Sequence, residues 1–370
     1  MAKRLIAWAL ALLLGMASLP VLGQSGDQEE QSPDPVKQIM EGMTLEEKVA
    51  QMFLVRCPSS GALKTVKDYQ PGGYILFAAD FEGETPASVR EKIQSWQQAG
   101  KVPMLVGVDE EGGTVTRVSR FKAFRPEKFW SPRDLYAQGG IPLIVEDALE
   151  KSQLLLDLGV NFNLAPVADI ATQRSDFMYQ RSLGQDAQTT ALYVASVVGA
   201  MNQAGIASAL KHFPGYGDNK DTHAGLVVDK RPYETFLQQD FLPFQAGIQA
   251  GAGCILVAHN IVNCMDSERP ASLSPRVHQI LREELGFAGV IMTDDLSMGA
   301  IKEYTGSAAA AVLAVEAGND LLCCSNFSTQ YRAVLDAVQE GRMSEERVEQ
   351  SVERILRWKL ELGIIAGQER

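Results

Sequence analysis

The chain has 370 residues, of which 46% are hydrophobic and 22% charged, and its formal net charge at pH 7 is −12. This is the composition of an ordinary folded protein and excludes a chain that is disordered over most of its length. The acidic balance also argues against a nucleic-acid partner, because such binding depends on attraction between basic side chains and phosphate.

The first residues have the pattern of an export signal. Lys3 and Arg4 precede an uncharged apolar run at 5–16, and residues suited to signal peptidase stand at 21–23. The run is shorter than the roughly 20 apolar residues of a membrane span. We therefore expect residues 1–23 to be a cleaved signal peptide, which leaves a secreted or extracytoplasmic chain of net charge −14 with no stable membrane span. An uncleaved anchor is the alternative.

Residues 24–35 are polar, acidic and contain proline, which is typical of a solvated linker, so we expect the folded domain to comprise residues 36–370. Within it, short apolar runs of strand length alternate with amphipathic segments of helix length. The eight runs are 52–55, 74–77, 104–109, 162–166, 207–213, 254–260, 290–295 and 321–325.

The segments between these runs begin and end with helix signals. Thr44 with Glu47 predicts a capping box, and Thr85-Pro86 and Ser274-Pro275 predict further helix starts. Glycines that follow the helical segments predict their ends: Gly100, Gly159, Gly205, Gly251, Gly286 and Gly318.

Alternation of strands with helices predicts a parallel sheet, since parallel neighbours need a long crossover connection. Eight such units predict an α/β fold of the (β/α)₈ TIM-barrel type as a single catalytic domain, with an open doubly wound sheet as the alternative. Active sites of such barrels lie at the carboxyl ends of the strands. Polar residues that directly follow an apolar run are therefore the first candidates for chemistry.

Four polar segments follow apolar runs in this way. Taken singly, each is more often a solvated loop or a helix cap, but four at one end of one barrel favour a shared site. Spacing alone does not choose between Asp294 and Asp295 as the functional acid. The segments are VDEEGGTVTR (108–117), YQRSLGQD (179–186), KHFPGYGDNKDTH (211–223) and TDDLSM (293–298).

The first, third and fourth of these segments together resemble the β-N-acetylhexosaminidase branch of glycoside hydrolase family 3, and the similarity in order and spacing extends over most of residues 40–365. The resemblance implies a single-domain retaining exo-β-N-acetylglucosaminidase. It implies that Asp294 is the nucleophile, that His223 is the general acid/base and that Asp221 orients His223. The residues implied to hold the terminal sugar are Asp109, Arg117, Arg181, Lys211 and His212.

These residue types suit the chemistry. A retaining glycosidase needs a carboxylate that attacks the anomeric carbon and a second group that first donates and then accepts a proton. A histidine titrates near operating pH, and an adjacent carboxylate can hold one tautomer of its ring. Because the loop that carries Asp221 and His223 is rich in glycine, we expect it to close over the sugar. No metal or other cofactor is expected.

Two departures from the family pattern concern affinity or leaving-group preference: Tyr216 stands where PGHG usually has His, and Thr114 where an Arg often follows the glycine pair. They motivate a non-catalytic sugar-binding barrel as one alternative, and the histidine acid/base motivates a phosphorylase as another. A metal-dependent hydrolase is disfavoured, because the chain has four histidines and lacks the His-x-His and His-Glu-x-x-His spacings.

The chain has five cysteines, an odd number and few for its length, so we expect most of them to be buried free thiols. Cys254 and Cys264 are the one pair that could form a disulfide. We expect a monomer that acts on a carbohydrate containing N-acetylglucosamine, with a peptidoglycan fragment, a chitin oligomer and another glycan left open as substrates.

Overall fold

The computed structural model describes residues 34–223 and 225–365, so the predicted signal peptide and most of the predicted linker lie outside the described residues. The described residues belong to one compact unit. The carboxylate of Asp34 caps the first helix by accepting the N–H of Val36 at 3.0 Å, and it pairs with Arg357 at 2.7 Å. The fold therefore includes the last two residues of the predicted linker.

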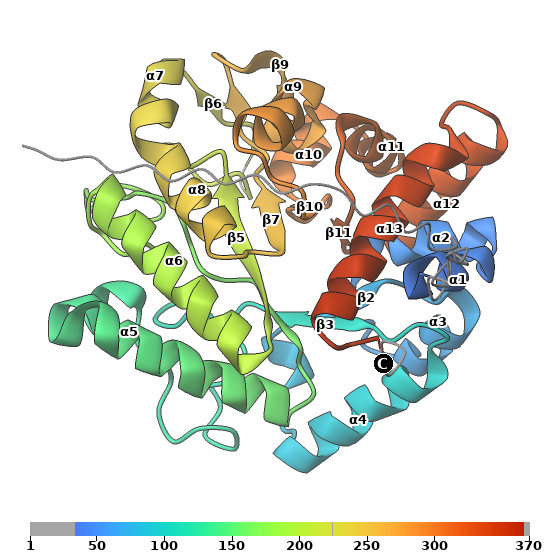
Figure 1. Ribbon diagram of the computed structural model, residues 1–370, viewed down its shortest axis with the longest axis horizontal. Helices are drawn as coiled ribbons and strands as arrows, with labels where there is room; N and C mark the ends of the chain where they lie inside the picture. Colours follow the sequence, from blue (N-terminus) through green and yellow to red (C-terminus); the bar gives the residue numbers. More distant parts are fainter. Residues whose placement is uncertain (1–33, 224, 366–370) are drawn as a thin grey trace, which may run out of the picture. The chain divides into compact units, whose positions relative to one another are not determined.

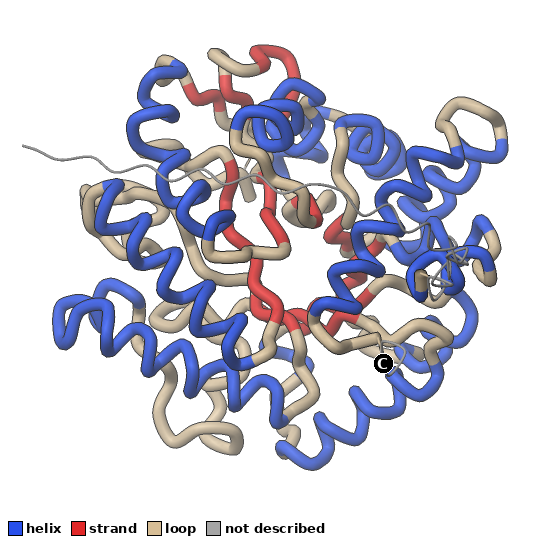
Figure 2. Tube along the Cα trace, viewed as in Figure 1, coloured by secondary structure: helices blue, strands red, loops and turns tan. Residues whose placement is uncertain are grey.

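Eight parallel strands form the centre of this unit and appear in Figure 2 as an inner ring inside the helices. Their order around the sheet is β10-β7-β5-β4-β3-β2-β1-β11. Leu321 closes the ring, because its carbonyl accepts the N–H of Thr293 at 3.0 Å beside a parallel bridge to Met292. The strands are β1 Phe53–Arg56, β2 Gly73–Leu76, β3 Leu105–Val108, β4 Phe162–Asn163, β5 Ala207–Phe213, β7 Cys254–Val257, β10 Val290–Thr293 and β11 Leu322–Cys324.

All eight predicted strands are thus confirmed, and the closed ring confirms the barrel over the open sheet. Helices surround it (Figure 1). They are α1 Pro35–Glu41, α2 Leu45–Gln51, α3 Ala62–Tyr69, α4 Pro86–Ala99, α5 Pro132–Asp157, α6 Ala187–Ala204, α7 Tyr233–Thr235, α8 Phe241–Gln249, α9 Pro275–Gln279, α10 Gly299–Tyr304, α11 Ser307–Ala317, α12 Phe327–Gln339 and α13 Glu345–Glu361, with short 3-10 turns at Ala78–Asp80 and Ala271–Leu273 and π turns at Phe236–Asp240 and Ile280–Glu284.

The predicted helix boundaries are confirmed where the sequence signals were clearest. Thr44 and Glu47 form the capping box of α2, and Thr85 and Ser274 cap α4 and α9 ahead of a proline. Gly205 ends α6 with φ of 79°, a left-handed conformation that glycine adopts without steric cost.

A small second sheet was not predicted. It consists of β6 Val228–Asp229, β8 Ile261–Val262 and β9 Asp266–Pro270. β6 and β8 have two residues each and β9 has the polar sequence DSERP, so none of the three shows the apolar alternation on which strand prediction depends. This sheet follows the loop that carries His223 and connects it to the segment after β7.

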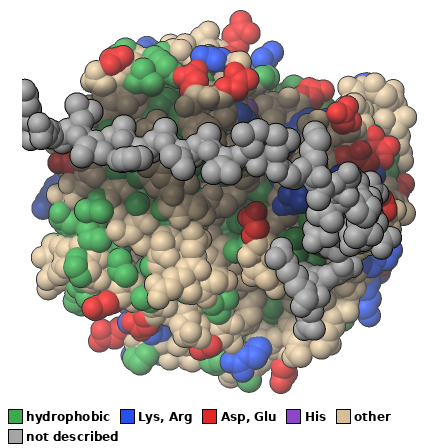
Figure 3. Space-filling model, in the orientation of Figure 1, with side chains coloured by type: hydrophobic (Ala, Val, Ile, Leu, Met, Phe, Trp, Pro, Cys, Tyr) green, Lys and Arg blue, Asp and Glu red, His purple; other side chains and the backbone are tan. Residues whose placement is uncertain are grey.

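All five cysteines are free, so the candidate pair Cys254 and Cys264 is not formed; Cys254 is buried and Cys264 exposed. Burial raises the pKa of the Cys57 thiol to about 12, which makes it unreactive. None of the described helices is long and apolar enough to cross a membrane. On the face drawn in Figure 3, acidic and basic side chains of the described residues are interspersed around the edge.

Candidate active site

A cavity of about 610 Å³ lies at the carboxyl ends of the barrel strands, where the fold predicts an active site. It brings together seven of the eight predicted site residues, and the eighth, Asp221, is hydrogen-bonded to one of them. The seven that line the cavity are Asp109, Arg117, Arg181, Lys211, His212, His223 and Asp294.

Charge pairs hold the sugar-binding candidates that follow β3 and lie on β5. Asp109 directly follows β3, and its Oδ1 accepts a hydrogen bond from Nζ of Lys211 at 2.6 Å. The guanidinium of Arg117 lies 3.7 Å from the other oxygen of Asp109. Lys211 is buried within β5, so its ammonium is fixed at the cavity floor before a ligand binds.

Glu111 is a functional candidate that the sequence analysis missed. It is buried, and its carboxylate accepts two hydrogen bonds from Arg181, at 2.9 and 2.6 Å, and lies 2.6 Å from Nζ of Lys211. Burial alone would raise the pKa of Glu111, but the two cations outweigh burial and hold it well below the usual range. The available signal was the third acid in VDEEGG, after Asp109 and Glu110, since cations enclosed by the fold need counter-charges.

Asp169, after β4, was also missed. It is buried and accepts hydrogen bonds from Nδ1 of His212 at 2.7 Å and from the backbone N–H of His212 at 3.1 Å. On the other side of the ring, Nη2 of Arg181 lies 3.3 Å from Nε2. Because a carboxylate accepts and a guanidinium donates, these contacts hold His212 with its proton on Nδ1.

The structure separates the two adjacent acids that spacing could not. The carboxylate of Asp295 accepts the N–H of Ser297 at 2.8 Å and the hydroxyl of Ser325, so it shapes the turn after β10. Asp294 accepts the N–H of Asp295 at 2.8 Å, and its Oδ2 has no hydrogen-bond partner in the described part of the chain. This difference supports Asp294 as the nucleophile.

The surroundings of Asp294 favour its ionised form. Burial would raise the pKa of its carboxyl, but His259, His212 and the N–H of Asp295 outweigh burial and hold that pKa below its ordinary value. His259, a third residue that the sequence analysis missed, is fully buried and contacts the carbonyl of Asp295 through Nε2 at 3.0 Å. Burial lowers the pKa of His259.

The candidate acid/base pair lies on the loop after β5. Oδ1 of Asp221 accepts hydrogen bonds from the backbone N–H of His223 at 2.9 Å and from its Nδ1 at 2.6 Å. The His223 side chain is 62% exposed and that of Asp221 37%. With Nδ1 engaged by a carboxylate, Nε2 is the nitrogen left to exchange a proton with a substrate.

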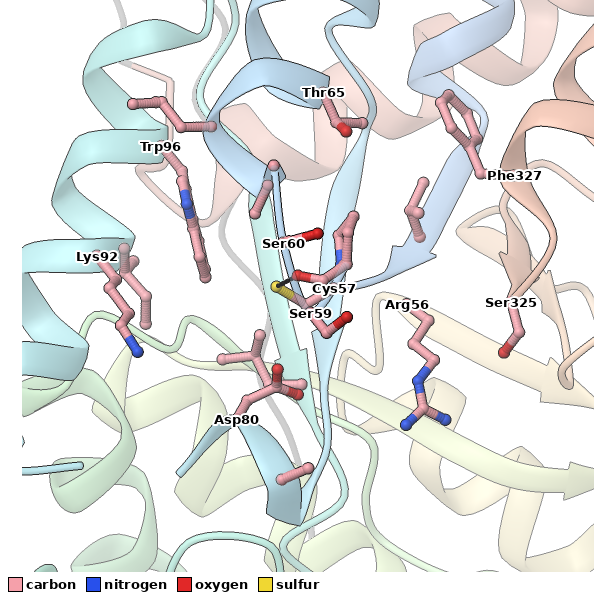
Figure 4. Close-up of a pocket in the computed structure, with 18 of the residues that line it drawn as sticks. Arg56, Cys57, Ser59, Ser60, Thr65, Asp80, Lys92, Trp96, Ser325 and Phe327 are labelled. Carbon is pink, nitrogen blue, oxygen red and sulfur yellow. Dashed lines mark hydrogen bonds between the residues drawn. The ribbon is translucent and has the colours of Figure 1, made fainter. Parts of the chain in front are cut away.

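A second, outer cavity of about 890 Å³ adjoins the catalytic cavity, and Arg56 and Ser325 line both. In Figure 4, these two residues lie on one side of the outer cavity, and Trp96 and Lys92 of α4 lie on the other. Space for a group larger than one sugar is therefore available beside β1. In the described part of the chain, no group of three or more His, Cys, Asp or Glu residues is arranged to hold a metal ion.

Comparison with known proteins shows the family. Residues 44–358 match the family described as "Glycosyl hydrolase family 3 N terminal domain". "Beta-hexosaminidase A" of Pseudoalteromonas piscicida is 31% identical over 325 residues, which are 80% of this chain but 54% of that protein, so the chain spans about half the length of this relative. "Beta-hexosaminidase" of Xanthomonas oryzae pv. oryzae is 34% identical over 281 residues, 74% of this chain and 81% of that protein.

Among solved structures, a glycoside hydrolase family 3 beta-N-acetylglucosaminidase from Paenibacillus sp. str. FPU-7 superposes with a TM-score of 0.82 at 33% identity, covering 89% of this chain and 64% of that one. The region that matches the family, residues 44–358, contains all eight barrel strands and every predicted site residue. The chain belongs to glycoside hydrolase family 3.

Proposed function

We propose that the protein is a retaining exo-β-N-acetylglucosaminidase that removes terminal β-linked N-acetylglucosamine. The observation that carries this proposal is one cavity in which Asp294, His223 and the sugar-binding candidates meet. The printed names of the relatives, beta-hexosaminidase and beta-N-acetylglucosaminidase, support the same activity.

The reaction divides into two steps. In the first, the Asp294 carboxylate attacks the anomeric carbon while Nε2 of His223 protonates the departing glycosidic oxygen, which gives a covalent glycosyl-enzyme and releases the aglycone. In the second, neutral His223 removes a proton from water, the water oxygen attacks the anomeric carbon, and Asp294 is freed. Two inversions leave the β configuration retained.

The buried side of the cavity would hold the terminal sugar. Asp109 offers an acceptor for sugar hydroxyls, and Lys211 and Arg181 offer charged donors that Asp109 and Glu111 already orient. A few polar groups fixed in this way give specificity at a carbohydrate site, because they need not reorganise when the ligand binds.

The direct test is hydrolysis of 4-nitrophenyl β-N-acetylglucosaminide by the purified protein, with the β-glucoside as matched control and the anomer of the first product read by NMR. We expect turnover of the acetamido sugar and a β-configured product. A protein that binds N-acetylglucosamine but releases no nitrophenol would instead be a sugar-binding barrel, and an α-configured product would exclude the covalent mechanism.

A specific observation favours phosphorolysis as a second candidate. Arg56 and Lys302 line the cavity, are exposed, and form no ion pair with any acid among the described residues. Two unpaired cations beside a histidine acid/base would attract phosphate, whose oxygen could replace water in the second step and release N-acetylglucosamine 1-phosphate. Turnover that rises with added phosphate, together with this product, would assign a phosphorylase; water as the sole acceptor would exclude it.

We also propose that the enzyme is exported. The support is the basic start and apolar run that precede residue 24. Sequencing the amino terminus of the protein made by its own cells should give a chain that begins at Gln24 outside the cytoplasm. An intact Met1 terminus in the cytoplasmic fraction would contradict export.

A further inference from the structure

One residue of the acid/base loop is buried although its neighbours are not. Thr222 lies between Asp221 and His223, and its side chain is 0% exposed. Its Oγ1 is 2.6 Å from the hydroxyl of Tyr216, and its carbonyl accepts the N–H of Ala300 at 3.1 Å. The loop is therefore docked at the residue that joins the two members of the candidate dyad.

Tyr216 is itself fixed to the sugar-binding side. Its backbone N–H donates to Asp169 at 2.8 Å, and its ring packs edge-on against His212 with centroids 5.3 Å apart. The base of the loop is tied down as well, because Arg231 donates to the carbonyl of Gly215 at 3.1 Å. The Tyr216 hydroxyl thus has a set position before it meets Thr222.

A second contact holds the far end of the loop. Oε2 of Glu303 on α10 accepts the N–H of Leu226 at 2.8 Å. Since α10 follows the turn that carries Asp294, the loop is docked between the nucleophile's element and the sugar-binding side. The contacts to Thr222 are buried, whereas the contact of Glu303 is exposed.

We propose that Tyr216 is a positioning residue that holds His223 over the cavity through its hydrogen bond to Thr222. This proposal rests on the proposed glycosidase function and deepens it. A phenol hydroxyl extends further from the backbone than either imidazole nitrogen, so the contact depends on the tyrosine that stands in this chain at the usual histidine of the motif. The hydrogen bond between His223 and Asp221 does not depend on Tyr216. Tyr216 determines where this pair lies relative to Asp294.

The test is Tyr216→Phe, which removes the hydroxyl and keeps the ring. Tyr74→Phe is the matched control, because the buried Tyr74 also donates one hydrogen bond, to the carbonyl of Ala62 at 2.8 Å, but lies outside the cavity lining. For aryl β-N-acetylglucosaminides with poor leaving groups, we expect kcat/KM to fall about threefold to tenfold in Tyr216→Phe. For 2,4-dinitrophenyl, which departs with little protonation, we expect less than about a twofold fall.

Thr222→Val removes the other half of the contact and should show the same leaving-group dependence. On poor leaving groups, kcat/KM of the double variant should be no lower than that of either single variant, because each single substitution already breaks the shared hydrogen bond. Equal losses on good and poor leaving groups, fully additive losses, or a Tyr216→Phe profile like that of Tyr74→Phe would overturn the positioning role.

A measurement independent of activity separates this proposal from the proposed function. Lys220 is exposed within the loop, so trypsin cleavage there reports how often the loop undocks. We expect Tyr216→Phe to be cut at Lys220 several times faster than wild type and Tyr74→Phe at the wild-type rate. Unchanged cleavage in Tyr216→Phe refutes the docking contact. A wild type that hydrolyses no β-N-acetylglucosaminide refutes the proposed function, while the cleavage comparison still decides the docking.

Discussion

The two sides of the catalytic cavity are built differently. On the sugar-binding side, Glu111, Asp169, Lys211 and His212 are at most 5% exposed, and each is held by at least two polar contacts. On the loop side, the His223 side chain is 62% exposed and is bound to Asp221. The candidate binding groups are thus fixed in the free protein, whereas the candidate proton-transfer group is held by a few contacts. Affinity and proton transfer should therefore be separable by mutation.

The largest effect should come from Asp294, the proposed nucleophile, which directly follows β10. Asp294→Asn removes the attacking carboxylate while keeping the acceptor for the N–H of Asp295, so we expect kcat to fall at least about a thousandfold without loss of stability. Asp295→Asn should be milder, since its role is to shape the turn. A rate for Asp294→Asn above about a hundredth of wild type, together with an inactive Asp295→Asn, would move the nucleophile to Asp295.

Glu111→Gln tests the buried side. Losing this carboxylate leaves Arg181 and Lys211 short of one buried counter-charge, which costs about 3–5 kcal/mol of the free energy of unfolding when one partner of a buried pair is removed. We expect a large rise in KM with the leaving-group dependence unchanged. Glu150→Gln is the control, because its pair with Arg125 is on the surface and should contribute about 0–1 kcal/mol.

If both variants unfold at the same urea concentration, the charge network does not organise this side of the cavity. If Glu111→Gln instead slows the hydrolysis of substrates with poor leaving groups selectively, then binding and proton transfer are not separable between the two sides of the cavity.

Asp221→Asn tests the loop side. At low pH, hydrolysis should be limited by protonation of Asp294, and because the pKa of Asp294 lies below its ordinary value of 3.8, this limb of the pH profile should lie below that pH. The amide keeps the shape of the side chain but presents no negative charge to Nδ1 of His223, so we expect the rate to fall most on poor leaving groups while the low-pH limb stays in place. Normal activity of Asp221→Asn on poor leaving groups would make Asp221 a loop residue only.

The smallest effect on activity should come from the opposite end of the barrel. Lys359 is fully buried and donates to Oε1 of Gln51, just before β1, at 2.9 Å; burial lowers its pKa to about 7. Between about pH 7 and 10.5 the folded state therefore binds fewer protons than the unfolded state, so this group makes stability rise with pH there.

Lys359→Met should remove that rise, increase stability at pH 7 and leave kcat/KM within about twofold. Urea unfolding at pH 7 and pH 9 measures the difference between wild type and variant. A difference that does not change with pH would show that Lys359 stays charged in the fold.

The sequence predicted the polar residues at the carboxyl ends of the strands, but it missed the buried acids that pair with them. Strand spacing marked the polar segments at the carboxyl ends of the apolar runs, and the family resemblance then selected Asp109, Lys211 and Asp294 within them. Glu111 and Asp169 act through buried partners on other strands, and that pairing becomes visible only when the barrel is closed. The fold was predicted well because each barrel strand lies in an apolar run, whereas β6 and β8 have two residues each and β9 has the polar sequence DSERP.

If the exposed loop supplies the proton and the buried side supplies the binding, His223→Ala and Glu111→Gln should lose kcat/KM in different patterns. The measurement is kcat/KM of both variants on aryl β-N-acetylglucosaminides of graded leaving-group acidity. For His223→Ala we expect a loss of about a hundredfold or more on the poorest leaving group, falling to a few-fold on 2,4-dinitrophenyl; for Glu111→Gln we expect a loss that does not depend on the leaving group. A loss for His223→Ala that is equal on all leaving groups would contradict this division of roles.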